Sequence, residues 1–175
     1  MGQVRARRVS VVVAIVLLAA ACSGGPAASS GPGNSTSTAG GGGNGDLAQV
    51  DACALLTPAE IQQVIGVAVG AGINQDSNVV RQCEWDTTDA TSGASVGITV
   101  RTFTNEDWQT VLAFPNATAV PGMGEEAYRN SPITGDLSVK KDGYEIDMAV
   151  LFAANTQAQT DQFTDSLMNL VLTRL

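Results

Sequence analysis

The sequence predicts an α+β fold with about five mostly antiparallel strands and with an N-terminal and a C-terminal helix packed on one face of the sheet. Three observations carry this prediction. Asp142-Gly143 separates two runs of alternating apolar and polar residues, which is typical of a two-residue β-hairpin. Thr57 and Thr156 each begin a helix-capping pattern that is followed by an apolar stripe.

The start of the chain has the composition of an export signal. Arg5, Arg7 and Arg8 precede Val11–Ala21, which carries no charge and is shorter than the ~20 apolar residues of a membrane span. Three alanines directly before Cys22 resemble the lipobox of bacterial lipoproteins. We therefore expect residues 1–21 to be a signal peptide and Cys22 to carry a diacylglyceryl (palmitate-type) anchor. The alternatives are an uncleaved signal anchor and an ordinary signal peptide with an incidental cysteine.

Residues 22–50 are predicted to form the lipidated cysteine and a flexible Gly/Ser/Thr tether, because this stretch has too few apolar side chains to build a core. Residues 51–175 are long enough for one domain. Without residues 1–21 the chain has six basic and seventeen acidic side chains, a net charge of −11. Nucleic acid is thus an unsuitable partner, because binding it needs clustered Lys and Arg. We expect a monomer.

Two further cysteines remain once Cys22 is assigned to the lipid. In an oxidising compartment outside the cytoplasm, Cys53 and Cys83 are expected to form a disulfide. The alternative is a pair of buried free thiols.

The elements are expected in the following order. Thr57 caps a helix of about two turns, with Pro58 first, Glu60 closing a capping box and Gly66 offering the stop. Gln82–Asp86 is a strand that places Cys83 and Trp85 on one face. The later elements are a strand over Ser95–Phe103, a short helix capped by Thr104 or Asn105 and ended by Pro115, a strand over Ala127–Arg129, a hairpin over Leu137–Phe152 and a helix from Thr156 to Thr173.

The hairpin has a predicted register. A type I′ turn at Asp142-Gly143 pairs Lys141 with Tyr144, Lys140 with Glu145, and so on to Leu137 with Met148. The apolar side chains then point inward, and four polar ones point outward into water: Ser138, Lys140, Glu145 and Asp147. Lys140 and Glu145 are expected to form a surface ion pair.

Catalytic chemistry is restricted, because the chain has no histidine. Ser138 and Lys140 share a strand face, but a solvated lysine is a poor base, so no catalytic residue is assigned. The acidic pairs, such as Glu125 and Glu126, match no EF-hand spacing, so no metal is expected. No cofactor is expected either. Trp85, Trp108 and Tyr128 are assigned to packing rather than to a ligand site.

Three motifs carry a resemblance to a known family: Cys53-x-Leu-Leu-Thr-Pro-x-Glu at a helix start, Cys83-x-Trp85 on a strand, and a Gly122-x-Gly124-x-x-Ala127 turn. Their order resembles a family of small actinobacterial cell-envelope lipoproteins with a domain of unknown function. The resemblance implies an envelope lipoprotein without an assigned reaction. The glycine spacing alone suggests a dinucleotide loop, but a strand and not a helix is expected to follow it.

These observations predict a noncatalytic binding or interaction module, not an enzyme, held on the extracytoplasmic face of the cell membrane. Its partner is an envelope protein or a small ligand. One alternative is a carrier or sensor of an apolar small molecule or lipid. The other is a carboxylate-dependent hydrolase. An apolar cavity favours the carrier, two convergent buried carboxylates favour the enzyme, and a flat apolar patch favours a protein partner.

Overall fold

The structure is a computed structural model that describes residues 45–89, 92–130, 135–153 and 155–175. The predicted signal peptide, Cys22 and the tether up to residue 44 lie outside the described residues. A 3₁₀ turn, η1 (Leu47–Gln49), stands in the last part of the stretch assigned to the tether, and Leu47 and Val50 pack against the core.

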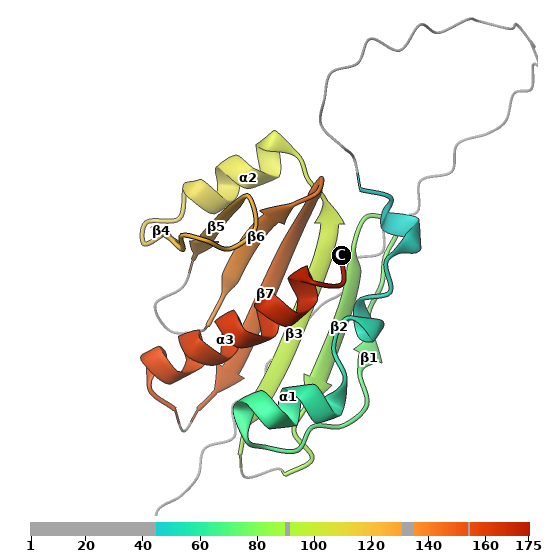
Figure 1. The fold of residues 1–175 in the computed structure, drawn as a ribbon, viewed down its shortest axis with the longest axis vertical. Coiled ribbons are helices and arrows are strands. Elements are labelled where there is room, and N and C mark those ends of the chain that lie inside the picture. The colour runs from blue at the N-terminus through green and yellow to red at the C-terminus, as the bar shows by residue number, and fades with distance from the viewer. Residues whose placement is uncertain (1–44, 90–91, 131–134, 154) are drawn as a thin grey trace, which may run out of the picture. The chain divides into compact units, whose positions relative to one another are not determined.

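The described chain forms a seven-stranded antiparallel sheet with the strand order β1-β2-β3-β7-β6-β5-β4 (Figure 1). The strands are β1 (Ile73–Asn74), β2 (Arg81–Asp86), β3 (Ala94–Thr102), β4 (Thr118–Ala119), β5 (Glu126–Arg129), β6 (Leu137–Lys141) and β7 (Tyr144–Phe152). The α+β class is confirmed, but the prediction of about five strands is wrong. The five expected strands are present, and the additional β1 and β4 have two residues each, which is too short for an alternating pattern to be visible.

The β6–β7 hairpin has the register that its turn residues predict. Asp142 and Gly143 both have positive φ, as a type I′ turn requires. All five predicted pairs, from Lys141 with Tyr144 to Leu137 with Met148, are present. Because the register is correct, Ile146 and Met148 face the core and are buried.

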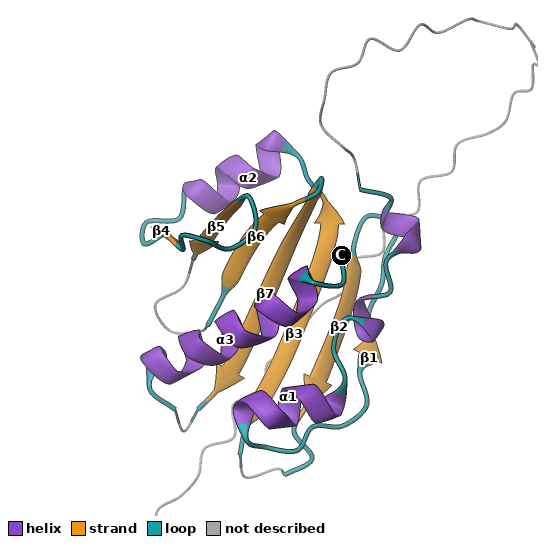
Figure 2. Ribbon diagram, viewed as in Figure 1, coloured by secondary structure: helices purple, strands orange, loops and turns teal. Residues whose placement is uncertain are grey.

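Two helices cover one face of the sheet, in front of the strands in Figures 1 and 2. These are α1 (Pro58–Ile65) and α3 (Gln157–Leu172), which begin with the predicted capping boxes at Thr57 and Thr156. Arg174, after α3, donates to the Leu55 carbonyl and forms an ion pair with Glu60 on α1. The N-terminal and C-terminal helices are therefore tied together over the same core.

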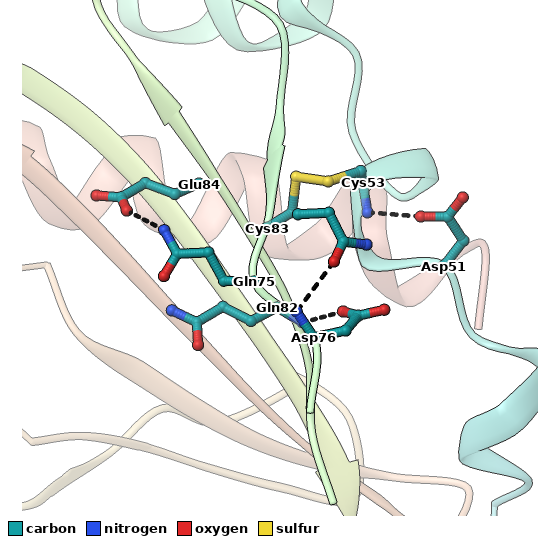
Figure 3. Close-up of a disulfide and its surroundings, with 8 residues drawn as sticks. Asp51, Cys53, Gln75, Asp76, Gln82, Cys83 and Glu84 are labelled. Atoms are coloured by element: carbon teal, nitrogen blue, oxygen red, sulfur yellow. Dashed lines mark hydrogen bonds between the residues drawn. A yellow bond between two sulfur atoms is a disulfide. The ribbon is translucent and has the colours of Figure 1, made fainter. Parts of the chain in front are cut away.

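The predicted disulfide is present. It joins Cys53, in the 3₁₀ turn η2 (Ala52–Ala54), to Cys83 on β2, with the two Cα atoms 5.1 Å apart (Figure 3). Cys83 and Trp85 are both buried on the core face, as their alternation predicts. Gly72 passes close to them, since a Cβ built at Gly72 would lie 2.6 Å from the Cys83 sulfur. The disulfide therefore lies in a tightly packed part of the core.

The third helix, α2 (Asn105–Leu112), lies on the other face of the sheet. Thr104 caps it, and Trp108 and Val111 are its buried residues. The Trp108 indole N–H donates to Glu126 at 2.9 Å, and its ring packs edge-on against Tyr128. Glu126 and Tyr128 alternate on β5 with Ala127, which belongs to the core. The face opposite α1 and α3 is thus partly covered, which the sequence did not predict.

The glycine turn before β5 behaves as a turn. Gly122 and Gly124 both have positive φ, and the strand β5 follows them. The dinucleotide-loop interpretation requires a helix N-terminus at this place, so it does not apply.

Candidate functional site

A cleft of about 700 Å³ opens between α2 and the sheet face that α1 and α3 leave uncovered. Its floor is formed by outward-pointing residues of the central strands, chiefly Gly97, Thr99 and Arg101 on β3 and Glu145, Asp147 and Ala149 on β7. Its apolar wall includes Val111 and Phe114 from the α2 segment and Leu151 from β7. The cleft is therefore lined mainly by the sheet and the α2 segment.

Small residues leave open space above part of the cleft floor. Gly97 and Ala149 are directly paired on neighbouring strands. A Cβ built at Gly97 would have no heavy atom within 4 Å, so the space above this residue is open. Glycine inside a strand packs no side chain and often marks a place where another group approaches the backbone.

A charged cluster lies in the floor next to this opening. The Arg101 guanidinium forms an ion pair with Asp147, and its Nε lies 3.7 Å from Glu145 Oε1. The Ser138 hydroxyl donates to the other oxygen of Asp147 at 2.5 Å, and the Asn130 amide donates to Ser138 at 2.7 Å. These side chains come from four different segments, so the tertiary fold assembles the cluster.

Glu145 lies on the predicted outward face, but the prediction that it points into water is wrong. Only 1% of this residue is exposed, and Ser138 is also buried. Lys140 lies opposite Glu145 in the register, but its amino group is 3.4 Å from Glu125 and stands over the Phe103 ring. The expected surface ion pair is thus replaced by the Glu145–Arg101 pair, because Arg101 on the neighbouring β3 faces Glu145 from its other side.

Burial raises the pKa of Glu145 to about 7. The negative charges of Asp147 and Asp107 act in the same direction, and the Arg101 charge opposes them. Glu145 therefore changes its charge near neutral pH, unlike an ordinary surface glutamate.

Three buried polar atoms of the cleft residues have no hydrogen-bond partner within the described part of the chain. They are Glu145 Oε2, Arg101 Nε and Asn130 Oδ1. Buried polar groups are nearly always paired, and perturbed carboxylates gather at functional sites. This concentration of buried atoms without a hydrogen bond makes the cleft the strongest candidate site among the residues that the structure describes.

Residues 17–160 match the model of a family described as a protein of unknown function, DUF3558. The chain belongs to the DUF3558 family. Neither the curated proteins nor the solved structures contain a match to it. The family identity of this DUF3558 protein therefore brings no assigned reaction, and its function has to be argued from the cleft.

Within the described ranges, the other residue combinations that the sequence singled out are not assembled as a second site. Ser138 donates to Asp147, whereas Lys140 is held by Glu125, so the two make no catalytic dyad. In the described ranges no three His, Cys, Asp or Glu residues come together in a way that could hold a metal ion. Trp85 lies in the core, and Trp108 packs on Tyr128 beneath α2. No helix of the described part is long and apolar enough to cross a membrane.

The sequence did not indicate Arg101, Asn130 and Gly97 as site residues of the DUF3558 protein. Arg101 and Asn130 contact Glu145, Asp147 and Ser138 on other strands, and these contacts are not visible in the sequence. Gly97 carried a signal in the sequence, since a glycine inside an otherwise regular strand indicates a close approach by another group.

Proposed function

We propose that this chain is a lipid-anchored extracytoplasmic protein that binds a small molecule in the cleft between α2 and the sheet, without catalysing a reaction. The observation that carries the proposal is the cleft itself. Its volume of about 700 Å³ lies inside the range of about 300 to 1,000 Å³ that is usual for small-molecule sites.

The anchoring part of the proposal rests on the sequence. Arg5, Arg7 and Arg8, the short apolar segment and Cys22 have the order of a lipoprotein signal. The DUF3558 match starts at residue 17, so the matched region includes Cys22. The Cys53–Cys83 disulfide supports an oxidising compartment. The resemblance to actinobacterial envelope lipoproteins belongs to the same proposal.

The anchor is tested by Cys22→Ser. This variant should lose the acyl groups and either leave the membrane fraction or remain unprocessed. Recovery of a mature, acylated variant with the membranes would contradict the assignment.

A mixed lining argues for an amphipathic ligand and against a purely apolar one. The wall has apolar side chains such as Phe114, while the floor carries Arg101 and Asp147. A hydrocarbon placed over these charges would desolvate them without offering a hydrogen bond, which costs free energy. The carrier of an apolar lipid is therefore the less suitable alternative.

The hydrolase alternative has one observation in its favour, namely Glu145 with a pKa near 7 close to a second carboxylate. The contacts of both groups argue against catalysis. Glu145 is almost completely buried, and both Asp147 oxygens are engaged by Arg101 and Ser138. A general acid has to reach the atom that it protonates, so we expect this pair to shape the site and not to turn over a substrate.

Native mass spectrometry of the full chain purified from its own host tests the proposed function. The expected result is a small-molecule adduct that is released on denaturation. Purification of the protein only in the unliganded state, and no adduct after incubation with a small-molecule extract of the same cells, would contradict the proposal.

A further inference from the structure

We propose that the ligand of the cleft is an organic cation, an amine or ammonium group attached to an apolar body. This inference rests on the proposed function, because it names the chemical class of molecule that the same cleft accepts.

The charges around the cleft favour a positive ligand. Five acidic side chains line it, and Arg101 is its single basic residue within the described part of the chain. The acidic side chains are Glu84, Asp107, Asp136, Glu145 and Asp147. Arg101 is already paired with Asp147 and Glu145, so it has little positive charge to offer an anion. The potential inside the cleft is therefore negative, which attracts a cation and repels an anion.

Glu145 adds an observation that is independent of the acid count. It is 1% exposed, forms part of the cleft lining, and its Oε2 accepts no hydrogen bond from the described residues. A buried carboxylate without a full set of donors is costly, and a nearby positive charge lowers that cost. The cluster thus gains stabilisation when a cation occupies the space above it.

The spacing of the acids favours an organic cation over a metal ion. Glu84 lies on β2 and accepts a hydrogen bond from the Gln75 amide (Figure 3). Asp107 lies on α2, and Asp136 precedes β6. Within the described ranges they do not converge as metal ligands do. Carboxylates spread around a cleft of about 700 Å³ suit a larger cation whose charge is shared among them.

The apolar wall fits the body of such a ligand. Phe114 is 48% exposed and Leu151 is 45% exposed, and both line the cleft together with Val111. Covering these side chains removes apolar surface from water. The Phe114 ring can also attract an ammonium group through its face.

Isothermal titration calorimetry on the mature chain in phosphatidylcholine nanodiscs tests the charge preference, with empty nanodiscs as the blank. Three compounds with the same body are compared: 4-phenylbutylammonium, 4-phenylbutyrate and 4-phenylbutanol. At about pH 8 the cation should bind at least about tenfold more tightly than the other two. Equal binding of all three, or preference for the carboxylate, would overturn the cation inference.

Variants locate the binding and separate the two proposals. Gly97→Val should fill the open floor and abolish binding of every compound. Asp107→Asn should weaken binding of the cation several-fold and leave binding of the alcohol unchanged. Glu106→Gln on the same helix should change the affinity for neither compound, because Glu106 does not line the cleft. Glu84→Gln repeats the test on another element if Asp107→Asn unfolds α2.

If the alcohol or the carboxylate binds best and Gly97→Val abolishes that binding, the cleft is a ligand site and only the cation inference is wrong. If none of the three compounds binds at millimolar concentration, or if binding survives Gly97→Val, the proposed cleft function is overturned as well.

Discussion

Glu145 on β7 and Arg101 on β3 are paired in the strand register, and Glu145 Oε1 lies 3.7 Å from Arg101 Nε. This pair stands in the floor of the cleft, where the carboxylate is almost fully buried. Among the residues that the structure describes, Arg101 is the positive charge that lowers the pKa of Glu145. The pair therefore joins β3 to β7 and also sets the charge in the floor of the proposed site.

Removing the positive partner should be costly when Glu145 is ionised. Arg101→Met should lower the free energy of unfolding by about 2 kcal/mol or more at pH 8, because a buried carboxylate loses its counter-charge. At pH 5 the loss should be smaller, since Glu145 is then neutral. Lys140→Met is the matched control and should cost less than about 1 kcal/mol, because it removes a more exposed pair with Glu125. Equal losses in urea unfolding at both pH values would contradict this role of Arg101.

Stability should fall as the pH rises from about 4.5 to about 7. An unfolded Glu145 loses its proton near 4.5, whereas the folded one keeps it until about 7, so the folded state binds more protons in this window. The groups that face it are Arg101, Asp147 and Asp107. The expected loss is on the order of 3 kcal/mol, and Glu145→Gln should remove most of the slope.

A different acid, Glu60, titrates below this window. Hydrogen bonds from Arg174 and Thr57 lower the pKa of Glu60 to about 2, so its contribution disappears only as the pH falls from about 4.5 towards 2. Urea titrations between pH 4.5 and 8 therefore report on Glu145. If Glu145→Gln leaves the dependence of the free energy of unfolding on pH unchanged in this range, Glu145 is not its cause.

The disulfide should be important for stability. Replacing both Cys53 and Cys83 by alanine should lower the free energy of unfolding by about 2 to 5 kcal/mol, because the bridge restricts the unfolded chain. Intact mass after alkylation without reductant should show no modified Cys53 or Cys83 in denatured wild-type protein. Alkylation of both cysteines in that sample would show that the bridge is absent.

Two glycines should respond in opposite ways to alanine. At Gly72 the new Cβ would lie 2.6 Å from the Cys83 sulfur and 2.8 Å from Trp85 Nε1, and both neighbours are fixed in the core. Gly72→Ala should therefore cost about 1 to 3 kcal/mol. Gly97→Ala enters open space and should be neutral or stabilising by up to about 1 kcal/mol. Thermal unfolding of the two variants measures both changes in stability. A larger loss of stability for Gly97→Ala than for Gly72→Ala would mean that the space above Gly97 is filled.

Local sequence signals predicted much of the fold. Asp142-Gly143 determined the hairpin register, Thr57 and Thr156 marked both helix starts, and Cys53 and Cys83 identified the bridge. These features depend on residues close together in the chain or on simple pairing rules.

The site could not be predicted in the same way. Alternation along β7 correctly placed Glu145 on the face away from the core, but it contains no information about what lies over that face. The burial of Glu145 depends on Arg101 and α2, which come from distant parts of the sequence. The strand period alone therefore led to the wrong prediction that the Glu145 carboxylate is solvated.

A crystal structure of the protein purified from its own host, with the co-purified molecule retained, would show directly whether the cleft between α2 and the sheet binds a ligand. We predict that the molecule lies between α2 and the sheet, above Gly97 and within contact distance of Phe114, with its positive group toward Asp147 and Glu145. A structure in which the co-purified molecule is bound elsewhere, and the cleft contains only solvent, would contradict the account.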